Sequence, residues 1–521
     1  MDQPSYSTEP HLLGVILRKI QNPYEYFDLC MLIMLCRVSK GLCEVTTLII
    51  DNCPSLDLSN MKLKISPFTI QLLAKQLSKR DSLTSINISG YNINTVDITP
   101  LAPSLALMTN LKYFNIYGNL FNINYMVALA PSIERMTDLT HLSISRTNIG
   151  STGVLALVEH GVLSNNLTHL DMSNTNICPN DFIKLAPSFA NMTKLTHLNI
   201  STDPYTDIIN VIMALAPHFA YMTNLTYLNL GGHQIKPASA IILATSFLHM
   251  SKLTNINLYS CSLADDDVIG LAPSFSRMTD LTRLNLSFNN INDAGVIGLA
   301  PSFSLMTNLT RLNLSSSNIT SEAGVTALGQ GLALMTNLTH LNLLYILVRY
   351  TYYKNRECGT LRGILLAQYL AHMNKLTYLN LRGNNIGIHG MIALAPCLLH
   401  MSKLTKLDLS HNLICAQGAI ALATCLLHMS KLTKLDLSHN EIHAQGALKI
   451  VRNCTHMTRL AYIDLSYNNI GGQGVRGLVP SLALMTNLTY IKLNNNSIRK
   501  HVILTIKTHF EQMPNLKVVI E

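Results

Sequence analysis

One short stretch sets the pattern for most of this chain: Leu281-Thr282-Arg283-Leu284-Asn285-Leu286-Ser287-Phe288-Asn289-Asn290-Ile291. Leu284 and Leu286 alternate with polar neighbours, as a short strand that is buried on one face requires. Asn289 stands where a side-chain amide can bond the backbone of the turn that leaves the strand. Gly295 follows where the chain passes close to its neighbour and enters a second apolar segment. The unit therefore predicts a strand, a turn and then a helix.

The same unit returns along almost the whole chain. Its first leucine falls at positions 83, 111, 139, 167, 195, 225, 253, 281, 309, 338, 376, 404, 432, 460, 488 and 516. Most steps are 28 residues, and a divergent first copy begins at Val45. No single unit can bury its own apolar face, so neighbouring units must stack to form one continuous core. About 17 parallel strands spaced ~4.8 Å apart would make a concave sheet roughly 80 Å long.

This LxxLxLxxNxI pattern, followed by a glycine and a second apolar segment, resembles leucine-rich repeats, and its period resembles the ribonuclease-inhibitor-like subclass. The resemblance covers residues 45 to 521. It implies an α/β solenoid, a curved horseshoe with a parallel concave sheet and convex helices, and a protein-sized binding surface. Where proline recurs in the convex segments, we expect two short helical turns or a kinked helix, as at Pro103, Pro131, Pro187, Pro273, Pro301 and Pro480.

The first part of the chain, residues 1 to 43, lacks the repeat and precedes a solenoid of residues 44 to 521. Its apolar residues have helical spacing. The segment resembles an F-box, the module that docks on the helical adaptor of cullin ubiquitin ligases. It departs from that family at Glu9, where a leucine is usual, and lacks a tryptophan after Val38-Ser39-Lys40. The resemblance implies adaptor contacts by Pro10, Leu12, Leu13, Ile16, Leu17, Val38 and Ser39. The alternative is a helical cap that shields the first repeat from water.

Side chains between the core leucines of each strand are expected to face a partner on the concave side. Three successive repeats place a histidine at the third position of the unit: His141, His169 and His197. A row of histidines one strand spacing apart could bind a metal ion or sense pH. The alternative is a row of exposed, hydrogen-bonding histidines that arose by duplication of the repeat.

A second row lies in the C-terminal repeats, where Asp408, Asp436 and Asp464 fill the fifth position of the unit. Neighbouring like charges repel, and we expect Lys406 and Lys434, two residues earlier, to relieve the repulsion. The row is either a docking patch for basic groups of a partner or a self-neutralised, solvated stripe. Further residues of this candidate surface are His411, His439, Tyr467 and the hot-spot types Arg283, Phe288, Arg311 and Tyr345.

The unit from 338 to 376 is 38 residues long where most are 28. Insertions in solenoids map to loops and often bear contacts. The candidate contact residues of this insertion, near positions 349–358, are Arg349, Tyr350, Tyr352, Tyr353, Lys354 and Arg356. The alternative is a surface loop without a binding role.

Composition narrows the class of function. A net charge of +9 over 521 residues, without a long basic block, does not indicate a nucleic-acid partner. The N-terminus lacks the basic region of a secretory signal, and the apolar run at 29–36 is too short to span a bilayer. The 11 cysteines contain no CxxC pair, which fits a reducing, intracellular compartment. Several, such as Cys397 and Cys425, stand where the repeat wants a small apolar side chain.

The sequence contains no GxxxxGK, HExxH or GxSxG motif and no GxGxxG after a strand. We therefore expect no catalytic residue and no cofactor, and a cytoplasmic monomer that binds another protein without contacting a membrane. The F-box resemblance and the repeats together predict a substrate-recognition adaptor of a cullin-type ubiquitin ligase. The alternatives are a generic leucine-rich-repeat binding or inhibitor protein and, as in some ribonuclease-inhibitor-like solenoids, a GTPase-activating accessory protein.

Overall fold

A computed structural model describes residues 54–57, 59, 67–78, 82–90, 98–119, 124–163, 166–203, 211–347, 356–511, 513 and 515–520. The chain divides into two compact units, Met1–Val162 and Leu163–Glu521. The F-box-like residues from Pro10 to Ser39 lie outside the described ranges, as do Arg349, Tyr350, Tyr352, Tyr353 and Lys354 of the insertion.

The first unit contains four strands that pair in parallel within the described residues. They are β1 (Ser55–Asp57) with β2 (Ser85–Asn87), β2 with β3 (Tyr113–Asn115), and β3 with β4 (His141–Ser143). The helical segments are α4 (Pro67–Leu77), η1 (Thr99–Leu101), α5 (Ala102–Leu105), α6 (Asn124–Glu134) and α7 (Gly150–Glu159).

The second unit repeats one strand and one helix, and each strand pairs in parallel with the next, residue for residue. Its strands are β5 (His169–Asp171), β6 (His197–Asn199), β7 (Tyr227–Asn229), β8 (Asn255–Asn257), β9 (Arg283–Asn285), β10 (Arg311–Asn313), β11 (His340–Asn342), β12 (Tyr378–Asn380), β13 (Lys406–Asp408), β14 (Lys434–Asp436), β15 (Tyr462–Asp464), β16 (Tyr490–Lys492) and β17 (Lys517–Val519).

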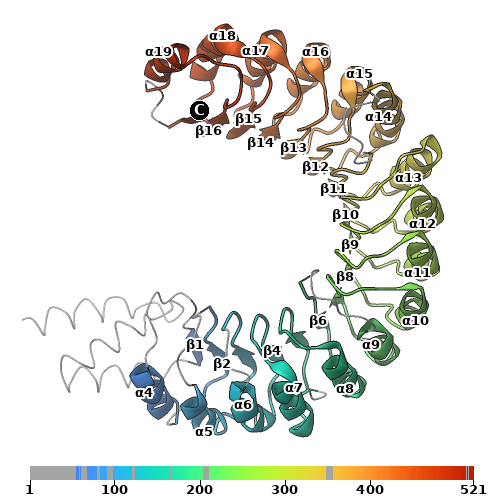
Figure 1. Ribbon diagram of the computed structural model, residues 1–521, viewed down its shortest axis with the longest axis vertical. Helices are drawn as coiled ribbons and strands as arrows, with labels where there is room; N and C mark the ends of the chain where they lie inside the picture. The colour runs from blue at the N-terminus through green and yellow to red at the C-terminus, as the bar shows by residue number, and fades with distance from the viewer. Residues whose placement is uncertain are drawn as a thin grey trace, which may run out of the picture. The chain divides into compact units, whose positions relative to one another are not determined.

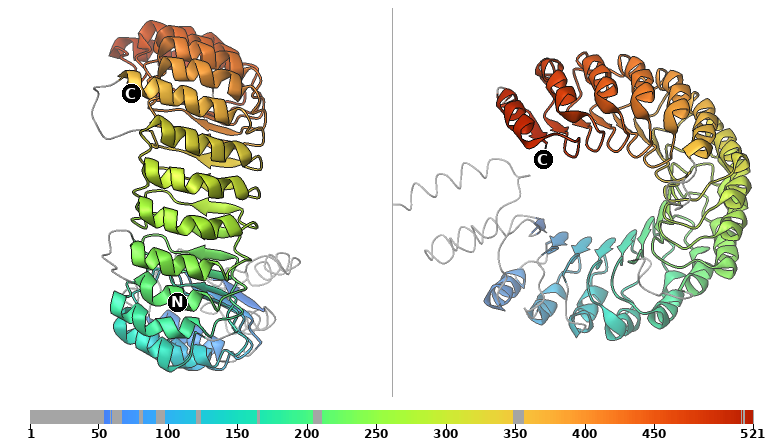
Figure 2. Two further views of the ribbon diagram at one scale, coloured as in Figure 1. Left: turned by 90° about the vertical axis from the view of Figure 1, so that its right-hand side faces the viewer. Right: turned by 45° about the horizontal axis from the view of Figure 1, so that its top comes forward.

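The helices of the second unit lie on the outer side of its strands (Figure 1). They are α8 (Pro179–Phe189), α9 (Val211–Phe219), α10 (Pro237–Phe247), α11 (Asp265–Arg277), α12 (Asp293–Leu305), α13 (Glu322–Leu334), α14 (Arg356–Leu370), α15 (Gly387–Leu398), α16 (Cys415–Leu426), α17 (His443–Cys454), α18 (Gly471–Ala483) and α19 (Lys500–Phe510). Successive helices lie side by side along this outer face (Figure 2). The second unit is therefore a curved solenoid with an inner sheet, as the repeat predicts.

The core of each repeat lies between the strand and the helix that follows it. In the repeat of β9, Leu284 and Leu286 are buried from the strand side, and Val296 and Phe303 are buried from α12. Gly295 confirms the predicted close approach, because a Cβ atom there would lie 2.5 Å from Oδ1 of Asp265 in the preceding repeat. A side chain at this position would therefore require the Asp265 carboxylate of the preceding repeat to move.

Of the two expected forms, two short helical turns or a kinked helix, the first is wrong for most of these repeats, because a single helix runs through the proline. Helix α12 runs through Pro301 without interruption, and α6, α8, α9, α11, α15 and α18 likewise contain an internal proline. Only around Pro103 do two elements, η1 and α5, take the place of one helix. Pro301 lies near the C-terminal end of α12, so the ring disturbs a single turn while the buried face keeps its packing.

Hydrogen bonds between neighbouring repeats hold the stack together on the helix side. The Ser302 hydroxyl donates to the Ala272 carbonyl at 2.7 Å, and the Cys425 thiol donates to the Ala395 carbonyl at 2.9 Å. The Cys397 thiol makes the same contact with Ala367 at 3.1 Å. The two cysteines are buried in the core, as small side chains at this position, and they also act as hydrogen-bond donors. A thiol can replace the serine hydroxyl here because both are small donors that point at the same buried carbonyl.

Candidate partner-binding surface

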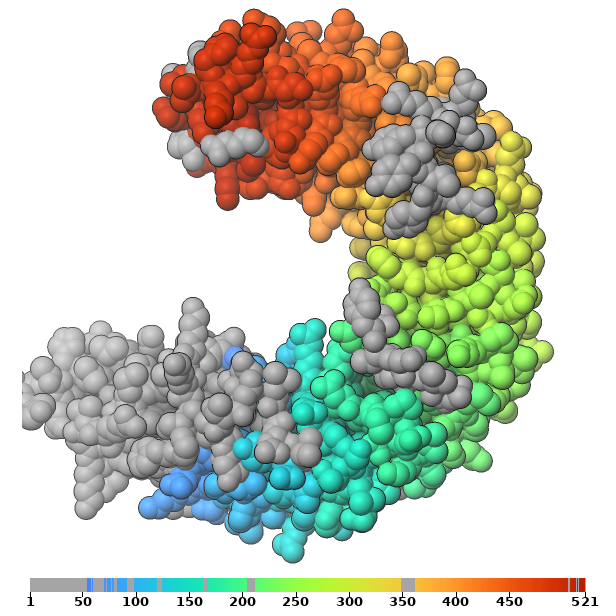
Figure 3. All heavy atoms as spheres, viewed as in Figure 1, coloured from blue at the N-terminus to red at the C-terminus, as the bar shows by residue number. Residues whose placement is uncertain are grey.

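The inner face of the second unit displays two rows of side chains. In β9, Leu284 is buried while Arg283 is exposed and Asn285 is half-buried, because successive side chains of a strand point to opposite faces. Since all neighbouring strands pair in register, the first residues form one line across the sheet and the third residues form another. We call these lines the first-position row and the third-position row. The space-filling view shows the described residues of the second unit as a curved body seen edge-on (Figure 3).

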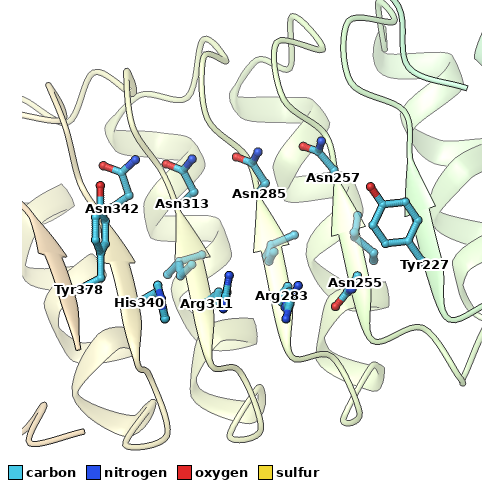
Figure 4. A pocket seen from close by; sticks show the side chains of 13 residues that line it. Tyr227, Asn255, Asn257, Arg283, Asn285, Arg311, Asn313, His340, Asn342 and Tyr378 are labelled. Atoms are coloured by element: carbon cyan, nitrogen blue, oxygen red, sulfur yellow. The ribbon is translucent and has the colours of Figure 1, made fainter. Parts of the chain in front are cut away.

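A hollow of about 340 Å³ crosses six strands of this face, β7 to β12. Tyr227 stands at one end and Tyr378 at the other, and Arg283 and Arg311 lie next to each other between them (Figure 4). The remaining polar lining comes from Asn255, His340 and the third-position row, which here contributes Asn257, Asn285, Asn313 and Asn342. The sequence selected Arg283 and Arg311 as contact residues, and the structure brings them together in one place.

The hollow carries uncompensated positive charge. Arg283 and Arg311 are register partners on β9 and β10, and none of the strands β7 to β12 contains an acidic residue. The ion pairs among the described residues are His160–Glu134, Lys184–Asp181 and Lys492–Asp464, so neither arginine is paired there. Burial, followed by the positive charges of Arg311 and Arg283, lowers the pKa of His340. His340 therefore stays neutral near pH 7 and adds no charge of its own.

The third-position row caps the turn that leaves each strand. Asn285 Oδ1 accepts hydrogen bonds from the Ser287 N–H at 3.1 Å and from its hydroxyl at 2.6 Å. Asp408 Oδ1 accepts the same two bonds from Ser410, at 3.0 and 2.6 Å. Asparagine and aspartate are thus interchangeable for the turn, and the choice between them sets the local charge. It is asparagine on β7 to β12 and aspartate on β13 to β15.

The predicted row of aspartates exists, but it is stabilised differently from the expectation. Burial, followed by the charges of Asp408 and Asp464, raises the pKa of Asp436. Asp464 pairs with Lys492 at 3.2 Å. Within the described residues Lys406 and Lys434 form no ion pair with these aspartates, and the Lys434 ammonium lies 4.6 Å from the Tyr462 ring centroid instead. The two lysines therefore do not relieve the repulsion through ion pairs, because side chains two residues apart on a strand lie roughly 7 Å apart and stand parallel.

Beyond the third-position row, the turns carry stacked aromatic rings. His411 stacks on His439 at 3.9 Å, and His439 stacks on Tyr467 at 3.9 Å. Nη2 of Arg382 lies 3.1 Å from Nε2 of His411. Arginine can only donate, so this hydrogen bond requires a neutral His411 ring. Burial, followed by the positive charge of a protonated His439 and of Arg382, lowers the pKa of His411 to about 4. The three residues predicted to extend the surface therefore form one continuous stack of neutral rings.

The aromatic residues of these turns have a strained backbone. Phe288, Tyr345, His411, His439 and Tyr467 all have φ between 53° and 58°, the left-handed region that bulky residues avoid. Glycine takes the same place at Gly383, where the Tyr345 ring occupies the space that a Cβ would need. Phe288 is nevertheless 50% exposed and Tyr467 46% exposed. An exposed aromatic ring held at a cost of order 1 kcal/mol favours a role in contact with a partner.

The three histidines that the sequence places in one row belong to two different units. His169 and His197 stack at 4.0 Å, and each Nδ1 lies 2.9 Å from the hydroxyl of the preceding threonine. His141 belongs to the first unit, where its ring lies 6.0 Å from that of Tyr113. In the part of the chain that the structure describes, no group of three or more His, Cys, Asp or Glu side chains could hold a metal ion.

His233 and Arg356 differ from what the repeat pattern predicts. His233 stands at the turn position where other repeats have asparagine; it is fully buried, and its Nε2 lies 2.6 Å from the Ile200 carbonyl. Burial lowers its pKa to about 4. Its position in the sequence, eight residues after the first leucine of its repeat, could have indicated this role. In addition, Arg356 begins helix α14, so it is not part of a loop as the insertion was expected to be.

Comparisons with known proteins agree with this architecture. Eight segments match the sequence model of the family described as Leucine Rich repeat: residues 135–158, 221–244, 277–300, 306–327, 372–395, 400–423, 428–451 and 453–479. Together with the fold, these matches support a leucine-rich-repeat protein, a class whose members generally bind protein partners. Among curated proteins, no sequence matches the chain.

Solved structures that match this chain in part include two bacterial proteins. One is a leucine-rich-repeat protein of Leptospira interrogans, with 15% identity over 91% of this chain and 97% of that chain and a TM-score of 0.47. The other is an internalin of Listeria monocytogenes, with 19% identity over 76% of this chain and 92% of that chain and a TM-score of 0.44. Among the described helices of the present chain, none combines the length and the hydropathy needed to cross a bilayer.

Proposed function

We propose that this chain is a protein-binding scaffold whose partner docks on the inner sheet face of the second unit. The observation that supports this proposal most directly is the hollow across β7 to β12, where two adjacent arginines lie between two tyrosines. Arginine and tyrosine are the residue types that dominate binding hot spots. The strained, exposed Phe288, three residues after Asn285 of the hollow, supports the same surface.

Site-specific photo-crosslinking tests this proposal. Benzoylphenylalanine would replace Phe288 on the inner side and, as a matched control, Ile297 on the outer helix α12; these side chains are 50% and 45% exposed. After irradiation in a lysate of the source cells, we expect a discrete protein adduct from position 288 and none from position 297. Absence of an adduct at position 288, or the same adduct from both positions, contradicts docking on the inner face.

A role as substrate-recognition adaptor of a cullin-type ubiquitin ligase is the finer form of this proposal. It rests on the F-box-like residues around Pro10 and Val38 and on a 28-residue period typical of the ribonuclease-inhibitor-like subclass. In this form the chain acts as a cytoplasmic monomer that brings a bound partner to the ligase. The full chain should retain the helical adaptor in a pull-down, and a chain without residues 1–43 should not. If the full chain fails to bind the adaptor, the ligase role is lost and the scaffold remains.

The insertion is a further proposed contact. Replacing residues 349–358 with the connection of a 28-residue repeat should weaken binding of the partner captured at position 288. Unchanged binding would remove the insertion from the proposed surface.

A further inference from the structure

We infer that the hollow across β7 to β12 binds an acidic, extended segment of the partner protein, with partner carboxylates seated between Arg283 and Arg311. The inference rests on the proposed scaffold function and names the chemistry of the partner. The charge, the lining and the length of the hollow favour a peptide as its occupant.

The charge of the hollow lacks an internal counterpart. Arg283 and Arg311 stand on adjacent strands, roughly 4.8 Å apart at the backbone. Like charges at that distance repel, and an external carboxylate between them relieves the repulsion while accepting several N–H donors. Two arginines are too few for a nucleic-acid strand, which presents a charge at every phosphate. A segment with one or two acidic side chains matches the charge that is present.

The third-position row shows that the positive charge is not required by the fold. Asn285 and Asp408 cap their turns with the same pair of bonds to a serine, at nearly identical distances. An aspartate at 285 could keep both bonds from Ser287, and an aspartate at 313 could keep the bond from the Ser315 N–H at 3.1 Å and would give up the bond from Nδ2 to the Ser287 hydroxyl at 3.2 Å. Either aspartate would add negative charge near the arginines. The chain instead has asparagine on every strand of the hollow, which leaves the arginines available to an external anion.

The walls of the hollow suit an extended peptide. The Tyr227 ring stacks on His197 at 5.8 Å and the Tyr378 ring stacks on His340 at 5.9 Å, so both ends are held by neighbouring strands. Six strands span roughly 24 Å, a distance that about seven residues of extended chain cover. Amides of the third-position row line the length between the tyrosines (Figure 4), and amides can bond a peptide backbone in either direction.

Fluorescence anisotropy with the full chain tests the inference. The probe is a labelled ten-residue peptide of alternating Glu and Ser, and its control is the same peptide with Gln in place of Glu. We expect the Glu peptide to bind about tenfold more tightly than the Gln peptide, the size of one lost charged hydrogen bond.

Three double variants locate the binding. Asn285→Asp with Asn313→Asp keeps the bonds from the backbone N–H groups of Ser287 and Ser315 and adds negative charge. Arg283→Gln with Arg311→Gln removes the charged donors. Each pair should weaken binding of the Glu peptide about tenfold. The matched control, Lys434→Gln with Lys517→Gln, removes two positive charges from the first-position row at least four strands away from Arg311, roughly 19 Å. It should change the affinity by no more than about twofold, because exposed charges beyond a Debye length are screened.

Several results would overturn the inference. These are equal binding of the Glu and Gln peptides, no effect of the Asn→Asp pair, or tighter binding of a single-stranded DNA oligonucleotide of equal charge. The last result would assign the hollow to nucleic acid. Crosslinking at position 288 separates the two proposals: an adduct there without Glu-peptide binding leaves the scaffold standing and refutes only the acidic partner. If both the adduct and the peptide binding are absent, both proposals fail.

Discussion

Replacing Asn440 with alanine should destabilise the turns on the inner edge of the second unit. Asn440 is fully buried. Its Oδ1 accepts from the N–H groups of Asn412 at 2.9 Å and Ile414 at 3.4 Å in the preceding repeat. Its Nδ2 donates to the carbonyls of Leu409 at 2.8 Å and Leu437 at 3.1 Å. One side chain thus satisfies backbone groups of two repeats.

The expected magnitude follows from what remains after the substitution. The Leu409 carbonyl keeps a bond from Asn412 Nδ2 at 3.0 Å, and the Leu437 carbonyl keeps one from Asn468 Nδ2 at 2.8 Å. The two N–H groups lose their side-chain acceptor. An unsatisfied buried donor costs ~1–3 kcal/mol. Because the bond to Ile414 is long, we expect a total loss of about 3 kcal/mol in local stability.

Hydrogen exchange followed by mass spectrometry measures this loss where it occurs. A long repeat array does not unfold in one step, so a single global free energy would be misleading. The peptide covering residues 409–415 should exchange about a hundredfold faster in Asn440→Ala than in the unchanged chain. The control is Asn308→Ala, which also removes an amide bond between repeats, to the Thr279 carbonyl at 3.0 Å, but at an exposed position.

The control should change local stability by no more than ~0.5 kcal/mol, because water replaces the lost donor. If Asn440→Ala exchanges no faster than Asn308→Ala, water or a backbone shift satisfies the freed N–H groups. The buried asparagines would then not hold the turns, and the reasoning above would be refuted.

Further predictions concern strain, pH and close packing. Phe288→Asn should leave the thermal midpoint unchanged or raise stability by up to about 1 kcal/mol, because asparagine tolerates its positive φ. It should also weaken retention in a pull-down of the partner that was identified by crosslinking, and a lower midpoint with unchanged retention would contradict both points. His233 has a folded pKa of about 4 against an unfolded value of 6.5. The stability that neutral His233 contributes is therefore complete above pH 6.5. It decreases as the pH falls and the unfolded chain takes up a proton, and the loss is about 2 kcal/mol at pH 5. His233→Asn should flatten the dependence of the thermal midpoint between pH 5 and pH 7.5, and an unaltered slope would exclude this source. Gly232→Ala should destabilise far more than Gly471→Ala in urea denaturation, because both have positive φ but only the first Cβ would meet a backbone oxygen, Thr202 O at 2.0 Å; equal losses would mean that strain alone matters.

Much of the architecture could be predicted because it depends on short-range pattern. The alternation around Leu284 and Leu286, repeated at a constant period, is enough to place a strand, and stacking follows since one repeat cannot cover its own apolar face. The role of Asn289 was predictable too: its amide donates to the Leu258 and Leu286 carbonyls at 2.8 and 2.9 Å. Position in the unit also indicates which side chains face inward, as it did for Arg283.

What those inward side chains do to one another depended on the tertiary structure. Lys434 rests on a tyrosine ring and not on an aspartate, and Cys425 donates to a carbonyl 30 residues away. Such contacts join atoms of different repeats, and small differences in rotamer and backbone angle decide them. The repeat pattern therefore establishes the solenoid and the direction of each side chain, since both follow from local periodicity. Which charges are neutralised, and hence that Arg283 and Arg311 lack an internal partner, emerges only when neighbouring strands are brought into register.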